Sequence, residues 1–132
     1  MYVTPFYAGL LALWFLVLSV RVVRGRQATG TQMGDGGHED LIRRIRAHGN
    51  FAEYVPLVLL MMGLLELGHT SIYVLHAMGI VLLFARLMHG YALAFTRKFF
   101  IGRFSGVTLT FALLAVGGGL CIWQGLRGMA LM

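Results

Sequence analysis

The chain is one domain in length, with 132 residues, of which 58% are hydrophobic and 12% charged, and a formal net charge of +6. Its mean hydropathy of +0.78 excludes an ordinary water-soluble globular protein and indicates a membrane protein. The basic residues lie at the ends of apolar segments, so membrane topology explains the positive charge and no nucleic-acid partner is expected.

Four apolar segments follow one another along the chain, over about residues 5–20, 51–67, 72–87 and 107–123. Each approaches the roughly 20 residues that a spanning helix needs once its flanks are counted. Backbone groups in lipid must be hydrogen-bonded within a helix or a closed barrel, so the segments predict an all-α integral membrane bundle of four helices. With polar flanks added, this single domain is predicted to have helices over about residues 4–24, 39–67, 71–95 and 103–126.

The first apolar segment could be a signal peptide or a retained helix. No positive charge precedes its apolar run and no small-residue cleavage site follows it, which favours a retained helix. The polar connection after it, RGRQATGTQMGDGGHEDL, is rich in glycine and is predicted to be a flexible loop. It lacks a preceding strand and a Gly-Lys-Ser/Thr ending, which argues against a phosphate-binding loop.

Lysine and arginine gather in the first connection and in the third, whereas the second connection, ELGHTS, and the N-terminus before Tyr7 have neither. The positive-inside rule therefore predicts that connections one and three are cytoplasmic and that both termini lie outside. We see no organelle signal, so the expected location is the bacterial inner membrane, with an internal eukaryotic membrane as the alternative.

The second apolar segment opens with polar residues, in RRIRAHGNFAEYVPL. At about 100° per residue, Asn50 lies about 40° from Arg46 around a helix, and Glu53 about 20° on the other side. These three residues therefore share one narrow helix face, which Tyr54 flanks, while His48 points to the opposite side. A charged residue costs roughly 2.5–3.5 kcal/mol at the centre of a spanning helix, so Glu53 predicts a polar cavity or a partner charge.

The third segment offers such partners in FARLMHGY, where Arg86 and His89 are one helical turn apart. One interpretation is an ion pair between Glu53 and Arg86, within the chain or across a subunit boundary. The other is a ligand site, because several arginines against one carboxylate leave positive charge that suits an anion. Carboxylates, an ammonium group and amides together describe a small zwitterionic peptide.

Glutathione fits that description best, because it also brings a thiol. A cysteine-type thiol has a pKa of ~8.5, and lowering it by ~2 units requires ~2.7 kcal/mol of preferential thiolate stabilisation. One or two arginine donors in a partly dry site supply energies of this size. Glutathione is therefore the expected cosubstrate. No metal site is expected, and Cys121, the sole cysteine, can form neither an internal disulfide nor a cysteine zinc cluster.

The fourth segment contains small residues at a spacing typical of close helix packing. Gly102 and Gly106 form a G-x-x-x-G pattern, and three more glycines follow at positions 117–119. Small residues let helices approach closely in lipid. These glycines therefore predict helix-to-helix contact, either within or between subunits.

The stretch RAHGNFAEYVP resembles the helix-two hallmark of the MAPEG family, the membrane-associated proteins of eicosanoid and glutathione metabolism, and FARLMH resembles its helix-three signature. The resemblance implies a homotrimer that binds glutathione between subunits near the cytoplasmic face. The resemblance implies that glutathione contacts the following residues of this chain: Arg46, Asn50, Glu53, Tyr54, Arg86, His89 and, at a carboxylate of the ligand, Arg21 or Arg24.

Two positions depart from the family pattern. Relatives commonly have a tyrosine seven residues after the helix-three arginine, where this chain has Leu93. Catalytic members also have a thiolate-stabilising arginine at the start of helix four, for which Arg103 is the best candidate, with Arg97 and Lys98 as alternatives.

Two functions are consistent with these residues. The first is a membrane glutathione transferase or peroxidase acting on lipophilic electrophiles held at the lipid-facing side of the site. The alternative is a non-catalytic membrane protein of the same fold that binds glutathione, lipid or another anion between subunits. A small transporter is a third class, supported by fold analogy alone.

Overall fold

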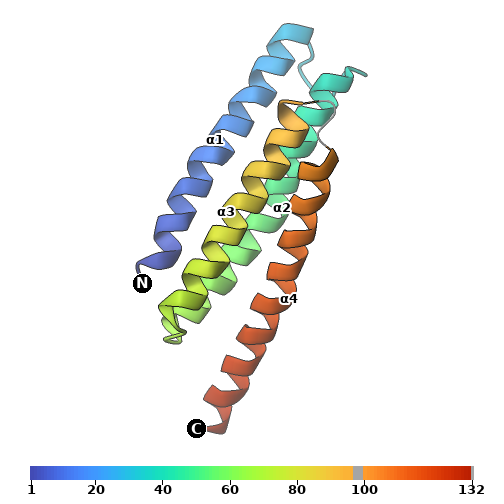
Figure 1. The fold of residues 1–132 in the computed structure, drawn as a ribbon. Helices are drawn as coiled ribbons and strands as arrows, with labels where there is room; N and C mark the ends of the chain where they lie inside the picture. Colours follow the sequence, from blue (N-terminus) through green and yellow to red (C-terminus); the bar gives the residue numbers. More distant parts are fainter. Residues whose placement is uncertain (97–99, 132) are drawn as a thin grey trace.

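The computed structural model describes residues 1–96 and 100–131. These residues form four helices: α1 (Val3–Thr29), α2 (Glu39–Leu67), α3 (Ile72–Ala94) and α4 (Phe100–Ala130) (Figure 1). All four are long and apolar enough to cross a membrane. The predicted all-α bundle is confirmed. α1 runs on to Thr29, past the predicted end near residue 24, and α4 is longer than predicted at both ends.

The two central helices are α2 and α3. α1 packs against both of them on one side and α4 packs against both on the other, while α1 and α4 do not touch within the described residues (Figure 1). Four helix termini meet at one end of the bundle, where α1 ends, α2 begins, α3 ends and α4 begins. We call this the basic end, because Arg21, Arg43, Arg44, Arg46 and Arg103 lie on the adjoining turns.

Local chemistry explains where two of these helices stop and start. α1 ends at Gly30, whose left-handed backbone (φ 66°) lets its N–H bond the carbonyls of Arg26 and Gln27. α2 begins with Glu39 and Asp40, whose negative charges favour the positive end of the helix dipole. Between them, Gly36 and Gly37 also have positive φ angles, so the connection turns sharply.

At the opposite end, Glu66 of α2 holds the start of α1. Its carboxylate accepts hydrogen bonds from the backbone N–H groups of Val3 and Thr4, each 2.8 Å long, and from that of Tyr2. These N–H groups have no partner within α1, so the carboxylate satisfies them and complements the helix dipole. Glu66 therefore has a structural role in joining α1 to α2.

Glycines permit the close approach of α4 to α3. A Cβ atom on Gly106 would lie 2.6 Å from the Ala85 carbonyl oxygen and 2.7 Å from Cβ of His89. Only a glycine fits there, which confirms helix contact within the subunit at this half of the G-x-x-x-G pattern. By contrast, a Cβ on Gly118 or Gly119 would meet nothing within 4 Å.

The outer faces of the helices remain strongly apolar. Leu13 and Leu16 of α1 are 64% and 59% exposed, and Ile101 and Ile122 of α4 are 73% and 65% exposed. Such surfaces would be unfavourable in water over this extent and are compatible with lipid.

Candidate functional site

A groove with a volume of about 570 Å³ opens between α2, α3 and α4 near the basic end. It brings together five of the residues predicted from the sequence: Arg46, Asn50, Glu53, His89 and Arg103. Its remaining lining residues are Ile42, Arg43, Ile45, Gly49, Leu93 and Val107. Residues from three separate stretches of the chain therefore converge on one polar recess.

The α2 wall of the groove carries the predicted face. Arg46 and Glu53 are exposed and Asn50 is half-buried, and all three line the recess as helical spacing predicts. His48 lies on the other side of the helix, where its ring stacks on Phe15 of α1 with centroids 4.5 Å apart. The helix geometry inferred from the sequence is therefore confirmed.

Arg86 is the most deeply buried charged residue described, with 1% of its surface exposed. Its Nη1 donates to Oδ1 of Asn50 at 2.9 Å, and its Nη2 donates to the Gly106 carbonyl at 2.9 Å and to the Thr110 hydroxyl. Arg86 thus ties α3 to both α2 and α4. Within residues 1–96 and 100–131, no ion pair joins it to Glu53.

The bond from Arg86 determines how the Asn50 amide is oriented. A guanidinium can only donate hydrogen bonds, so the Asn50 oxygen must face Arg86. The other half of the amide, Nδ2, has no partner in the described part of the chain. Asn50 therefore presents hydrogen-bond donors to the groove, and a ligand must meet it with an acceptor such as a carbonyl or carboxylate oxygen.

The electrostatics of the groove favour an anion with one cationic group. Among the described residues that line it, Arg43, Arg46 and Arg103 supply three positive charges and Glu53 one negative charge. Arg103 lies in the first turn of α4, where the helix dipole adds positive potential. His89, only 3% exposed, lies on the α3 side of the recess. No group of three or more metal-ligating side chains occurs in the described ranges.

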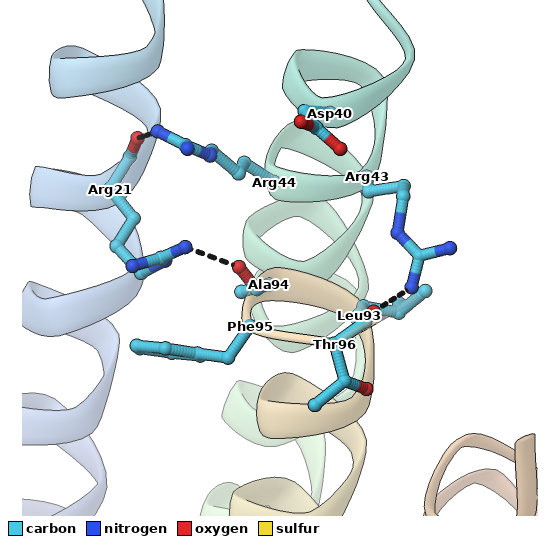
Figure 2. Close-up of a pocket in the computed structure, with 8 residues that line it drawn as sticks. All are labelled: Arg21, Asp40, Arg43, Arg44, Leu93, Ala94, Phe95 and Thr96. Carbon is cyan, nitrogen blue, oxygen red and sulfur yellow. Dashed lines mark hydrogen bonds between the residues drawn. The ribbon is translucent and has the colours of Figure 1, made fainter. Parts of the chain in front are cut away.

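Other predicted site residues do not line the groove. Tyr54 packs against Phe111 of α4 with ring centroids 5.6 Å apart. Arg21 of α1 points to the end of α3, where it bonds the Ala94 carbonyl and lies 3.8 Å from the Phe95 ring centroid (Figure 2). Arg24 is exposed on α1. Arg97 and Lys98 lie outside the described residues.

Sequence reasoning missed two groups at this site. Arg43 lines the groove and also donates to carbonyls at the end of α3. Thr110 receives a bond from Arg86 and itself donates to the Gly106 carbonyl at 2.8 Å. The sequence did contain a signal for Thr110: it lies one turn after Gly106, so it shares the helix face that was predicted to contact another helix.

Comparison with known proteins gives this arrangement a family. The model of the MAPEG family matches residues 4–123, nearly the whole chain. The chain belongs to the MAPEG family. It is similar to the inner membrane protein YecN of Escherichia coli, with 39% identity over 112 residues, which cover 85% of this chain and 84% of YecN. YecN from a second E. coli strain gives the same values. No solved structure matches the chain significantly.

Membership of the MAPEG family confirms the resemblance seen in RAHGNFAEYVP and FARLMH. The four apolar helices make this MAPEG protein an integral membrane protein. Together with the similarity to YecN, they support a location in the inner membrane.

Proposed function

We propose that this MAPEG protein binds glutathione in the groove and transfers it to lipophilic electrophiles or uses it to reduce lipid hydroperoxides. The observation that carries the proposal is the convergence of Arg46, Glu53 and the Nδ2 group of Asn50 on one recess. No hydrogen bond or ion pair occupies these groups within the described residues. They are available to a ligand.

The groups in the groove complement a zwitterionic tripeptide. Arg46 and Arg103 match carboxylates, Glu53 matches the ammonium group, and the Asn50 amide matches a carbonyl or carboxylate oxygen. The volume of about 570 Å³ falls in the range of small-molecule sites, roughly 300–1,000 Å³.

The proposal includes assembly as a homotrimer, with the site completed between subunits and its basic end on the cytoplasmic side. In the single chain the groove is open, and Arg21 and Arg24 do not line it. Because Arg21 is held at the end of α3, Arg24 is the α1 arginine that would reach bound glutathione from a neighbouring subunit. Its expected partner there is a ligand carboxylate.

For catalysis we assign thiolate stabilisation to Arg103, with Arg97 and Lys98 as alternatives. The thiol proton leaves to solvent, and the positive charge of Arg103 stabilises the sulfur anion. With a chlorinated nitrobenzene, a sulfur–carbon bond forms and chloride leaves with the electron pair. With a lipid hydroperoxide, two glutathione molecules are oxidised to a disulfide as the peroxide becomes an alcohol and water.

Turnover tests the proposal directly. Purified protein in detergent is mixed with glutathione and a chlorinated nitrobenzene, and both the conjugate and the ultraviolet absorbance of the thiolate are followed. We expect conjugate formation and a thiolate signal on adding glutathione. Absence of both, together with no thermal stabilisation at millimolar glutathione, would exclude glutathione as the ligand.

A second candidate is a non-catalytic protein that binds glutathione, lipid or another anion in the same groove. Leu93 favours it, because this groove residue stands where relatives commonly have a tyrosine hydroxyl. Thermal stabilisation by glutathione without turnover would support this candidate. Stabilisation by other anions alone would point to a different ligand.

A further inference from the structure

A second recess lies at the basic end, around the end of α3 and between residues of α1 and α2 (Figure 2). Its volume is about 170 Å³, and its lining residues are Arg21, Asp40, Arg43, Arg44, Leu93, Ala94, Phe95 and Thr96. We propose that this recess binds the phosphate of an anionic phospholipid whose acyl chains follow the lipid-facing side of α1 and α3. The proposal does not depend on glutathione binding.

Interhelical hydrogen bonds hold the arginines of this recess in place. Arg21 of α1 donates to the Ala94 carbonyl at the end of α3, and Arg44 of α2 donates to the Arg21 carbonyl at 3.2 Å. Arg43 donates to the carbonyls of Ala92 and Thr96. Arg21 and Arg43 are therefore held at the carboxyl end of α3, and Arg44 is held against the Arg21 backbone of α1.

These bonds leave donors available for a ligand. Each guanidinium carries five N–H groups, and only one or two per arginine are used in the bonds described. Within the described lining, three arginines are accompanied by one carboxylate, that of Asp40. Arginine binds phosphate oxygens through paired N–H groups. The recess thus has both the charge and the donors that a phosphate requires.

Aromatic residues extend from the recess along the outside of the bundle. The Arg21 guanidinium lies over the Phe95 ring, and Phe95 stacks on Trp14 and on Tyr91 with centroids 6.0 and 5.5 Å apart. Tyr91 is 51% exposed and Phe95 41% exposed. Tryptophan and tyrosine favour the headgroup level of a membrane. This stack therefore marks the depth at which a lipid phosphate meets its glycerol and acyl chains.

The size and position of the recess favour a lipid over a soluble metabolite. A volume of about 170 Å³ is below the roughly 300–1,000 Å³ of whole small-molecule sites, but it accepts a phosphate group. Apolar, exposed surface continues directly from it along spanning helices. A phospholipid satisfies both regions at once.

The simplest competing explanation is that these arginines only cap α3 and orient the protein in the membrane. That explanation predicts only the general attraction of a basic surface for anionic lipid, to which every exposed arginine at this end contributes alike. Binding of a headgroup phosphate predicts a further, local preference for anionic lipid of about fivefold, taking ~1 kcal/mol for the recess as a whole because its guanidinium groups are already bonded in part to carbonyls.

Tryptophan fluorescence can measure this preference, because the chain has two tryptophans and only Trp14 belongs to the stack. In a Trp123→Phe background, the protein is reconstituted in phosphatidylcholine with small fractions of brominated phosphatidylglycerol or of brominated phosphatidylcholine with identical chains. We expect the anionic lipid to quench Trp14 at about fivefold lower mole fraction. Equal quenching by both lipids would overturn the proposal without any arginine variant.

Substitutions of single arginines test whether the preference for anionic lipid arises at the recess. Arg44→Gln should bring the two lipids within about twofold, whereas Arg44→Lys should retain most of the preference. The matched control is Arg24→Gln, which removes an exposed charge at the same end of the bundle from a residue that does not line the recess. If Arg44→Gln and Arg24→Gln have equal effects, the preference is a property of overall charge at this end and the proposal is wrong.

A soluble competitor distinguishes lipid from free phosphate. Glycerol phosphate at millimolar concentration should leave the quenching preference unchanged, because it lacks the acyl chains that lie against the aromatic stack. Complete loss of the preference would instead assign the recess to a soluble phosphate ester. Helical circular dichroism of each reconstituted variant verifies that it is folded.

Discussion

Arg86 and Asn50 are joined by a hydrogen bond of 2.9 Å from Nη1 to Oδ1, and this bond gives the two residues different tasks. Arg86 is buried among helices and acts on the groove through Asn50. Asn50 accepts from Arg86 with its oxygen, so its amide hydrogens remain for a ligand. Arg86 is therefore a positioning residue, and Asn50 is the group that contacts ligand in the proposed complex.

Asn50→Asp tests whether Asn50 donates a hydrogen bond to the ligand. The aspartate keeps an oxygen toward Arg86 and adds charge attraction, so the melting temperature should be unchanged or higher. It replaces the donor toward the groove with a second acceptor, so the Kd for glutathione should rise at least about tenfold, as expected for loss of a hydrogen bond to a charged group. Calorimetry and thermal denaturation measure the two effects separately. Unchanged affinity would show that Asn50 does not donate to the ligand.

Arg86→Met should destabilise the fold. The substitution removes bonds to α2 and α4 and leaves buried acceptors on Asn50 and Thr110, at a cost of about 2–4 kcal/mol. Denaturation in detergent measures the change, with the lipid-facing Leu87→Met as the neighbouring control. A variant of normal stability that fails to bind glutathione would instead make Arg86 a direct ligand contact.

Gly106→Ala tests the approach of α4 to α3. The added Cβ would lie 2.6 Å from a backbone oxygen of α3, which cannot move aside as a flexible side chain could, so we expect a loss of about 1–3 kcal/mol. Gly119→Ala is the matched control, because its Cβ meets nothing and helix propensity favours alanine. Equal stability of the two variants would contradict the packing described.

Glu53→Gln distinguishes ligand binding from assembly. Loss of the carboxylate charge should weaken glutathione binding by about tenfold or more while leaving the oligomer intact, since hydrogen bonds to charged groups contribute about 1.5–3 kcal/mol. Light scattering in detergent reports the assembly, and calorimetry the affinity. Dissociation of the oligomer would favour an ion pair between Glu53 and an arginine of another subunit.

Arg103→Ala should lower turnover about a hundredfold with a smaller loss of affinity, because a preorganised charge acts chiefly on the developing anion. Arg103→Lys should recover part of the rate. The thiolate absorbance should fall together with kcat. Unchanged turnover in Arg103→Ala would transfer the role to Arg97 or Lys98.

Local helical geometry made much of the site predictable. The spacing of Arg46, Asn50 and Glu53 places them on one side of any α-helix, so their shared face required no knowledge of neighbouring helices. The acidic start of α2 and the need for hydrogen-bonded backbone in lipid likewise follow from the chain itself. For these reasons the sequence by itself determined four spanning helices, the bounds of α2 and the polar face of the groove.

Only the tertiary structure decided which side chains meet. The sequence left open whether an arginine on α3 pairs with Glu53 or with Asn50. Helix packing brings Arg86 to Asn50, and Arg86 also donates hydrogen bonds to the Gly106 carbonyl and the Thr110 hydroxyl. Helix packing also directs Arg21 to the end of α3, away from the groove. Such pairings depend on helix rotation and separation, which are set by many distant contacts such as that at Gly106, and no local pattern in the sequence encodes them.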